Sequence, residues 1–151
     1  MTTTFPPPIA DLLQEFAEFP DWDERYAFIV ELGRQLPPIN PALQTAENRV
    51  HGCMSTVWLV ARATQNGEPH LEIIADSDSL IVKGLIVILL SLFSGRPLAE
   101  VVTADVEAVF QQLGLAQHLS PNRRNGLYSM VKRIKTLAVE QLSQPLAPSG
   151  D

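Results

Sequence analysis

Apolar residues recur every three or four positions in three separate parts of the chain, and this spacing is typical of amphipathic helices. It predicts one helix over 9–16, a second over 21–36 and a last one over 121–138. Pro37 and Pro38 follow the second stretch, and proline cannot donate the amide hydrogen that a continuing helix needs. Each of these helices is expected to bury one apolar stripe against a common core.

The ends of these helices carry recognisable capping residues. Asp21 and Glu24 have the spacing of a capping box at the start of the second helix. Ser120 is placed to cap the last helix, with Pro121 at its first position. Short helices are expected between 98 and 114, with Gly114 as a C-terminal stop.

Residues 80–93 are apolar on nearly every side, which predicts the central helix of the core. The stretch is too short and too interrupted to span a membrane. Residues 76–79 ahead of it, Asp-Ser-Asp-Ser, form a helix-start signal. Gly84 inside it costs about 1 kcal/mol relative to alanine. Either another backbone crosses closely at Gly84, or the glycine is tolerated by chance.

Three short segments favour strands because they are rich in β-branched and aromatic residues. They cover 48–50, 56–63 and 70–75, and residues 65–68 supply an Asn-Gly hairpin turn between the last two. Together with the helices they predict an α+β fold, in which a three-stranded antiparallel sheet packs against several helices. Residues 1–143 are expected to form a single domain, and residues 144–151 a disordered tail.

The one cysteine of the chain, Cys53, lies between the first two predicted strands. Gly52 and Ser55 interrupt the strand pattern on either side, and such an interruption indicates a bend. A lone cysteine is most often a small buried apolar residue. At the tip of a bend, however, the thiol would have the access that a reactive cysteine requires.

The chain has 151 residues, 46% of them apolar, and a formal charge of −6. This charge argues against a nucleic-acid or anionic-membrane partner. One cysteine forms no internal disulfide and the N-terminus has no signal-peptide pattern, so we expect a cytoplasmic protein. Monomer and weak homodimer fit the composition equally. Residues 1–31 hold seven acids and one arginine, whereas 123–135 hold five bases and no acid, an asymmetry that could guide docking.

Arg123 and Arg124 occupy the first turn of the last predicted helix, where the helix dipole favours acids. Their position is either chance or part of an anion site built with the helix amides. If Cys53 lies nearby, such a site would favour its thiolate. His51, two residues before Cys53, would share its face in a strand and could lower the thiol pKa, or it could be a solvated surface histidine.

Several blocks of the sequence, in this order and spacing, resemble the SufE family of sulfur-acceptor proteins for iron–sulfur cluster assembly. The blocks are Trp22-Asp23-Glu24-Arg25-Tyr26, Glu31-Leu32-Gly33, Val50-His51-Gly52-Cys53-Met54-Ser55, Asp76-Ser77-Asp78, Ile81-Val82-Lys83-Gly84-Leu85, His118-Leu119-Ser120-Pro121 and Asn125-Gly126-Leu127 with Arg123. His51 and Met54 depart from the family pattern.

The resemblance implies a relay and a fold like that of IscU-type scaffolds. A cysteine desulfurase of the SufS or CsdA type, which uses pyridoxal phosphate, would form a persulfide and be stimulated by this chain. Cys53 would take its outer sulfur and pass it to a scaffold complex of the SufBCD type. The carrier itself would need no cofactor and no metal. Arg123 would lie near the cysteine loop. Asp78 is expected first to cap a helix and, as the second choice, to contact that loop.

Thiol chemistry supports the same assignment, because persulfide transfer resembles thiol–disulfide exchange. A second thiol would attack the new persulfide and release sulfide, so a carrier needs one cysteine. Three alternatives remain: a Cys–His acyl-transfer enzyme, a metal or iron–sulfur scaffold, and a binding-only regulator of the desulfurase. The first lacks a cysteine-protease sequence around Cys53, and the second lacks further thiolates.

Overall fold

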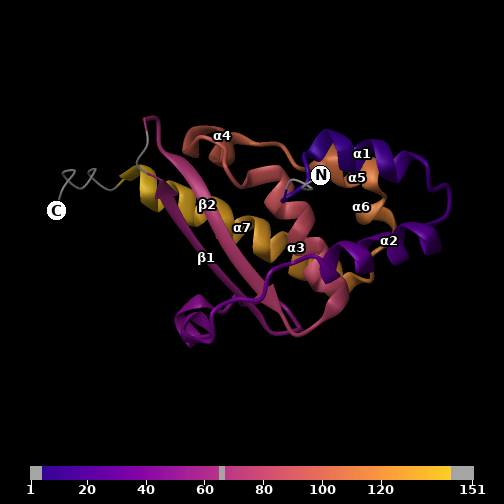
Figure 1. The fold of residues 1–151 in the computed structure, drawn as a ribbon, viewed down its shortest axis with the longest axis horizontal. Helices are drawn as coiled ribbons and strands as arrows, with labels where there is room; N and C mark the ends of the chain where they lie inside the picture. The colour runs from indigo at the N-terminus through magenta and orange to yellow at the C-terminus, as the bar shows by residue number, and fades with distance from the viewer. Residues whose placement is uncertain (1–4, 65–66, 144–151) are drawn as a thin grey trace.

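The computed structural model describes residues 5–64 and 67–143 and contains a hairpin with helices packed against one of its faces (Figure 1). The expected tail, 144–151, and Gln65 and Asn66 of the expected hairpin turn lie outside the described residues. The elements in chain order are α1 (Ile9–Ala17), α2 (Trp22–Arg34), β1 (Val57–Thr64), β2 (His70–Ser77), α3 (Leu80–Phe93), α4 (Leu98–Thr103), α5 (Glu107–Leu113), α6 (Leu115–His118) and α7 (Pro121–Ser143). Two 3-10 turns, Pro41–Leu43 and Ala46–Asn48, lie between α2 and β1.

The sheet has two strands in the described part of the chain rather than the predicted three. β1 and β2 pair antiparallel from Val57 opposite Ser77 to Thr64 opposite His70. The expected first strand is reduced to one bridge between Arg49 and Trp58. The prediction was wrong because the chain is held in a 3-10 turn up to Asn48 and bends again at Gly52, whose φ is +90°. Too few extended residues remain between those bends for a strand.

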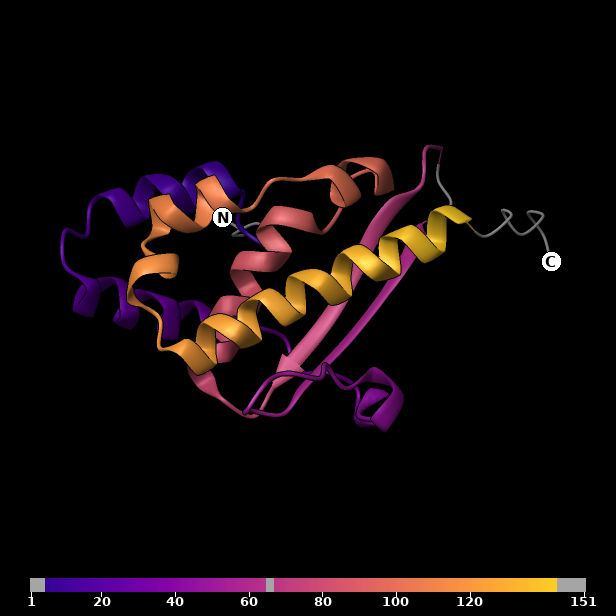
Figure 2. The same cartoon turned by 180° about the vertical axis from the view of Figure 1, so that it is seen from behind.

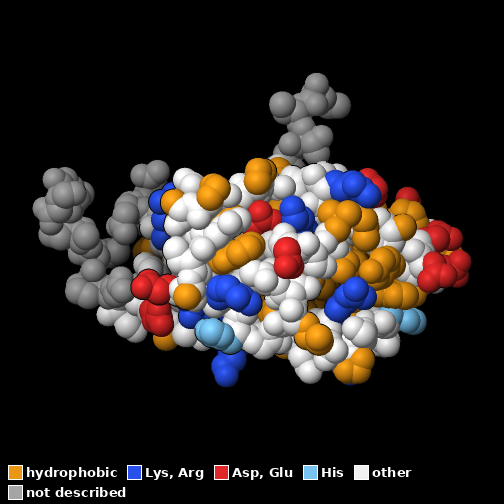
Figure 3. Space-filling view, turned by 90° about the horizontal axis from the view of Figure 1, so that it is seen from below, with side chains coloured by type: hydrophobic (Ala, Val, Ile, Leu, Met, Phe, Trp, Pro, Cys, Tyr) orange, Lys and Arg blue, Asp and Glu red, His pale blue; other side chains and the backbone are white. Residues whose placement is uncertain are grey.

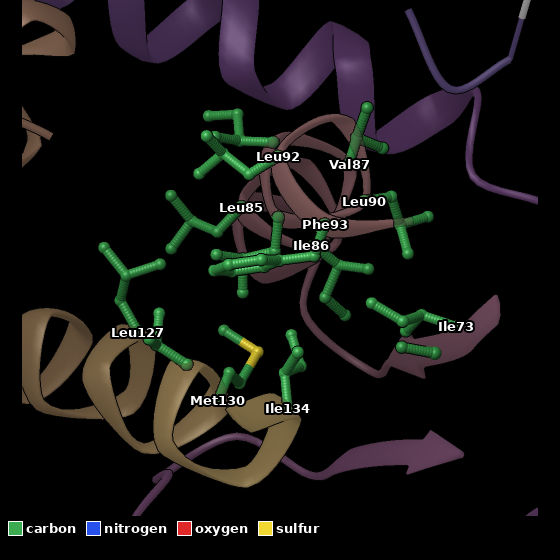
Figure 4. Close-up of a cluster of buried hydrophobic side chains, with 14 of the residues drawn as sticks. Ile73, Leu85, Ile86, Val87, Leu90, Leu92, Phe93, Leu127, Met130 and Ile134 are labelled. Atoms are coloured by element: carbon green, nitrogen blue, oxygen red, sulfur yellow. The ribbon is translucent and has the colours of Figure 1, made fainter. Parts of the chain in front are cut away.

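Helix α3 forms the centre of the core, as its all-round apolar character predicts. Eleven of its residues are buried, and they meet apolar side chains from α7 and β2 (Figure 4). Met130 and Ile134 of α7 and Ile73 of β2 point towards them. Helix α7 packs on β1 and crosses in front of the hairpin in Figure 2. The position of α7 matters for function because its N-terminal half meets the cysteine loop.

Helices α2 and α3 cross at two glycines. A Cβ built on Gly84 would overlap the carbonyl oxygen of Ile29, and one built on Gly33 would lie 2.5 Å from the carbonyl oxygen of Leu80. Only glycine permits backbones to approach this closely. The interpretation of Gly84 as a close crossing is therefore confirmed, and the partner backbone is that of α2.

Several predicted helix ends agree with the structure, but α7 continues five residues beyond the predicted 138, and Asp76 and Ser77 of the predicted helix-start signal belong to β2. Gly114 ends α5 in the left-handed conformation, with φ +80°. The Ser120 hydroxyl accepts a hydrogen bond from the Arg123 amide at 3.4 Å. Asp21 is the N-cap residue of α2 but makes no side-chain capping hydrogen bond. No helix within the described ranges is long and apolar enough to cross a membrane.

Candidate functional site

Cys53 lies on a bent loop, 51–55, that runs along the lower edge of the molecule in Figure 1. Before the loop, the buried Val50 donates its amide hydrogen to the carbonyl of Val57 at 2.9 Å. Gly52 then reverses the chain direction with a positive φ. Met54, next to the cysteine, is 80% exposed. The cysteine is thus at the tip of a bend, as the interrupted strand pattern predicts.

A clamp on Thr56 fixes the other end of the loop. The Asp78 carboxylate accepts the Thr56 amide hydrogen at 3.1 Å, and the Asp78 amide donates to the Thr56 carbonyl at 3.3 Å. The Ser77 hydroxyl donates to the same carbonyl at 2.7 Å. The N-cap of α3 is Ser79, so Asp78 contacts the loop rather than capping the helix. This reverses the expected order of its two roles.

Asp76 supports this clamp from inside the fold, a role that the helix-start interpretation of residues 76–79 missed. Its buried carboxylate accepts amide hydrogens from Ser77 at 2.8 Å and Ile39 at 3.1 Å. The Lys83 ammonium lies 3.5 Å from one of its oxygens. A buried charge is stable only with such partners. Asp76 therefore joins β2, α3 and the chain after α2 at the base of the cysteine loop.

The cysteine side chain itself rests against α7. Its thiol is half-buried and donates to the carbonyl oxygen of Gly126, with the sulfur 3.6 Å from that oxygen. A Cβ at Gly126 would lie 3.4 Å from the sulfur, an ordinary contact. A Cβ at Gly52 would lie 2.5 Å from the Ser129 hydroxyl, so the loop also touches the helix one residue earlier. The close crossing of the loop and α7 therefore requires glycine at position 52.

Cys53 borders a hollow of about 290 Å³ between the loop, α3 and the start of α7. Its lining is mixed: Val82, Leu85, Leu127 and Met130 supply apolar surface, and Ser55, Ser120, Asn122 and Arg123 supply polar groups. The exposed Arg123 guanidinium also lies 5.8 Å from the ring centroid of Tyr26. The structure therefore brings Cys53, Ser55 and Arg123 to one hollow. Its volume exceeds what a single sulfur atom needs.

Burial raises the pKa of the Cys53 thiol, and the Arg49 guanidinium lowers it by a smaller amount. Burial acts by disfavouring the charged thiolate. The cation that offsets burial is thus Arg49, a residue that no motif of the sequence marks as functional. Arg49 is close to Cys53 in sequence, but only the bend places its charge to act on the thiol.

His51 does not share the hollow with Cys53. Residues 51 and 52 form a turn rather than a strand, so the expectation that both side chains face the same way is wrong. His51 is exposed and lines a separate hollow with Arg49, Ser129 and Lys132. Among the described residues, the hydrogen-bond partner of the Cys53 thiol is a carbonyl oxygen and not an imidazole. The geometry gives no support to a Cys–His catalytic pair.

No group of three or more His, Cys, Asp and Glu side chains in residues 5–64 and 67–143 is placed to hold a metal ion. The site therefore consists of a thiol, a bent loop and a hollow. Fold and site together define a small protein of mixed α and β structure that presents one half-buried cysteine beside a cavity.

The comparisons with known proteins assign the chain to a family. The model described as "SufE: Fe-S metabolism associated domain" matches residues 10–138, and the chain belongs to the SufE family. A SufE-like protein of Rhizobium meliloti, named as uncharacterised, is 42% identical over 132 residues, covering 87% of this chain and 94% of that protein. Another from Rhizobium etli is 42% identical over 125 residues, covering 82% of this chain and 84% of its own.

The solution structure of a hypothetical protein from Thermus thermophilus is also similar, with a TM-score of 0.69. The likeness covers 90% of this chain and 96% of that one at 20% identity. At this identity the likeness concerns the fold alone. The family assignment confirms the resemblance carried by the sequence blocks and supports a role in iron–sulfur metabolism.

Proposed function

We propose that this chain is a sulfur acceptor and carrier that takes persulfide sulfur from a cysteine desulfurase onto Cys53. The donor is an enzyme of the SufS or CsdA type, which uses pyridoxal phosphate and is stimulated when its product sulfur is removed. The carrier then passes the sulfur to a scaffold complex of the SufBCD type in the cytoplasm. The observation that carries the proposal is the single thiol, half-buried on a bent loop beside a hollow.

The transfer is an exchange between sulfur atoms. The Cys53 thiolate attacks the outer sulfur of the desulfurase persulfide, the sulfur–sulfur bond of the donor breaks, and the desulfurase thiolate leaves. The thiol proton of Cys53 passes to solvent before the attack. The product is a persulfide on Cys53, with no net oxidation. A second exchange of the same kind hands the outer sulfur to the scaffold.

The loop has few attachments that would oppose its movement into another active site. Among the described residues, the hydrogen bond from the thiol to Gly126 is the one that ties residues 51–55 to the rest of the fold. A thiol is a weak donor, so this bond is readily given up. The anchors at Val50 and Thr56 remain while the tip moves.

The hollow suits a sulfur that must survive between donor and acceptor. Its apolar lining keeps a new persulfide away from thiols in solution, and burial against α7 restrains Cys53 from reacting before it docks. The raised thiol pKa fits this picture, because a sheltered thiol is largely protonated and slow to react. Contact with the desulfurase would move the thiol out of this environment.

Intact-mass measurement tests the proposal directly. The chain is mixed with a cysteine desulfurase and free cysteine and is then weighed without reductant. A carrier gains the mass of one or more sulfur atoms, and treatment with a thiol removes them. The Cys53→Ser variant is expected to gain none. An unchanged mass of the wild-type chain, together with a stimulated desulfurase, would instead establish a binding-only regulator.

A further inference from the structure

A second hollow, which the proposed transfer does not use, lies on the other side of the cysteine loop. It has a volume of about 310 Å³ and is lined by Arg49, His51, Lys132 and Arg133, with the hydroxyl-bearing Ser129 and Thr136. We call it the basic hollow. No acidic residue of the described part of the chain lines it. It shares no lining residue with the hollow at Cys53, and Gly52 crosses α7 between the two.

Within residues 5–64 and 67–143, the cations of the basic hollow form no ion pair. The ion pairs among the described residues are made by Arg34, Arg62 and Lys83, and none involves Arg49, Lys132 or Arg133. One guanidinium nitrogen of Arg133, Nη2, donates to the Glu47 carbonyl at 3.2 Å. Its Nε is buried without a hydrogen-bond partner among the described residues. A buried unpaired donor is costly, and because Nε is covered in this conformation it gains a new acceptor only when the Arg133 side chain moves.

The charge stands out because the whole chain carries −6. Figure 3 shows the molecule from below, with basic side chains spread across the face, acidic clusters towards its left and right ends and further acidic side chains near its centre. A hollow lined by three cations that form no ion pair among the described residues is electrostatically suited to a localised acidic patch of a partner. A long polyanion such as nucleic acid would meet the acidic remainder of the surface and be repelled.

We propose that the basic hollow receives acidic side chains of the desulfurase when Cys53 enters its active site. This inference rests on the proposed function. Arg49 belongs to the hollow and lies just before the loop, so any protein that takes Cys53 into its active site must lie close to this surface. Arginine binds a carboxylate through two parallel hydrogen bonds, and two arginines, Arg49 and Arg133, line this hollow. The basic hollow would therefore orient the carrier while the other hollow releases the thiol.

The experiment compares two double variants, each of which removes two positive charges, but from different parts of the surface. Lys132→Gln/Arg133→Gln changes the basic hollow, whereas Arg34→Gln/Arg62→Gln changes exposed cations elsewhere on α2 and β1. The rate of the desulfurase is measured against carrier concentration. We expect the half-saturating concentration to rise about tenfold for the hollow variant, equivalent to about 1.4 kcal/mol. The rate at saturation should be unchanged, and the control should resemble the wild type.

Salt gives a second readout. Added salt should raise the half-saturating concentration of the wild type and of the control more steeply than that of the hollow variant, because fewer charges remain to be screened. Equal half-saturating concentrations for the two double variants would overturn the inference. So would a loss confined to the rate at saturation, because that would place the cations in the chemistry rather than in docking.

Folding and the proposed function are controlled separately. Arg133→Gln removes a contact to Glu47, so melting temperatures are compared first. If the double variant is destabilised, the single variant Lys132→Glu replaces it, because Lys132 is exposed. Arg62→Glu is then the control. A wild-type chain that gains no sulfur refutes the carrier function and, with it, this inference. A chain that gains sulfur but is insensitive to Lys132 and Arg133 refutes the inference alone.

Discussion

The crossing of α2 and α3 at Gly84 is expected to be intolerant of a single methyl group. Gly84→Ala would place a carbon onto the Ile29 carbonyl oxygen and 2.7 Å from its carbonyl carbon. Non-bonded heavy atoms require roughly 3.5 Å, so the two helices would have to separate by about 1 Å or more. Both obstacles are backbone atoms, which cannot rotate away as a side chain could.

The magnitude follows from two opposing terms. Alanine is favoured over glycine inside a helix by about 1 kcal/mol. Overpacking a well-packed core costs about 1–3 kcal/mol and sometimes more, and a backbone obstacle belongs at the upper end of that range. We therefore expect Gly84→Ala to lower the free energy of unfolding by about 2 kcal/mol after the helix gain is subtracted.

Gly126 provides a matched control, because it is also a glycine inside a helix and is also buried. A Cβ there would meet the Cys53 sulfur at 3.4 Å, an ordinary contact. Gly126→Ala should therefore keep most of the helix gain and be neutral or more stable by up to about 1 kcal/mol. Gly33→Ala, at 2.5 Å from the Leu80 carbonyl oxygen, should fall between the two.

Urea unfolding followed by circular dichroism measures these differences. With a slope of about 2 kcal/mol per molar urea, Gly84→Ala should unfold at a midpoint about 1 M below that of the wild type. The order of midpoints should be Gly126→Ala highest, then Gly33→Ala, then Gly84→Ala. If Gly84→Ala were as stable as Gly126→Ala, the close crossing of α2 and α3 would not limit the stability of the fold, which would refute the prediction.

Three further predictions concern the cysteine loop. Arg49→Gln should raise the pKa of Cys53 further, because it removes the positive charge that offsets burial. At a fixed pH below that pKa, iodoacetamide should alkylate Cys53 more slowly in the variant than in the wild type. Faster alkylation would contradict the role assigned to Arg49. Asp78→Ala should leave the Thr56 amide without its acceptor, lower the free energy of unfolding by about 1–2 kcal/mol and accelerate the alkylation of Cys53. An unchanged alkylation rate would show that Asp78 does not hold the cysteine loop in place. His51→Ala should slow sulfur uptake only modestly, since His51 faces the other hollow; a loss as large as that from Cys53→Ser would show a direct role.

The pH dependence of stability has a defined sign for the thiol. The pKa of Cys53 is raised in the folded state, so the folded chain holds this proton more tightly than the unfolded one. Its contribution is complete below the unfolded pKa and is lost as pH rises through the folded pKa. The Cys53→Ser variant should therefore lose less of its free energy of unfolding than the wild type as the pH is raised through the pKa of the thiol.

Local patterns located most of the helices and the paired strands: the burial of one face leaves a regular spacing, full burial leaves a continuous apolar run, and strands are rich in β-branched and aromatic residues. The central helix was predicted over 80–93, and the structure has Leu80–Phe93. Glycine beside the lone cysteine located the bend, since few other residues adopt a positive φ. The predicted first strand failed because a run of three residues has too little pattern to distinguish a strand from a single bridge.

Tertiary structure alone decided what surrounds the thiol. The sequence identified Cys53 and placed Arg123 at a helix start, but only the packing of α7 against the loop brings them to one hollow. The same crossing sets the sulfur against Gly126 and turns His51 away. Such contacts join residues more than seventy positions apart. They depend on how whole helices pack against one another. That packing is determined by the side chains of the entire core and not by any local sequence pattern.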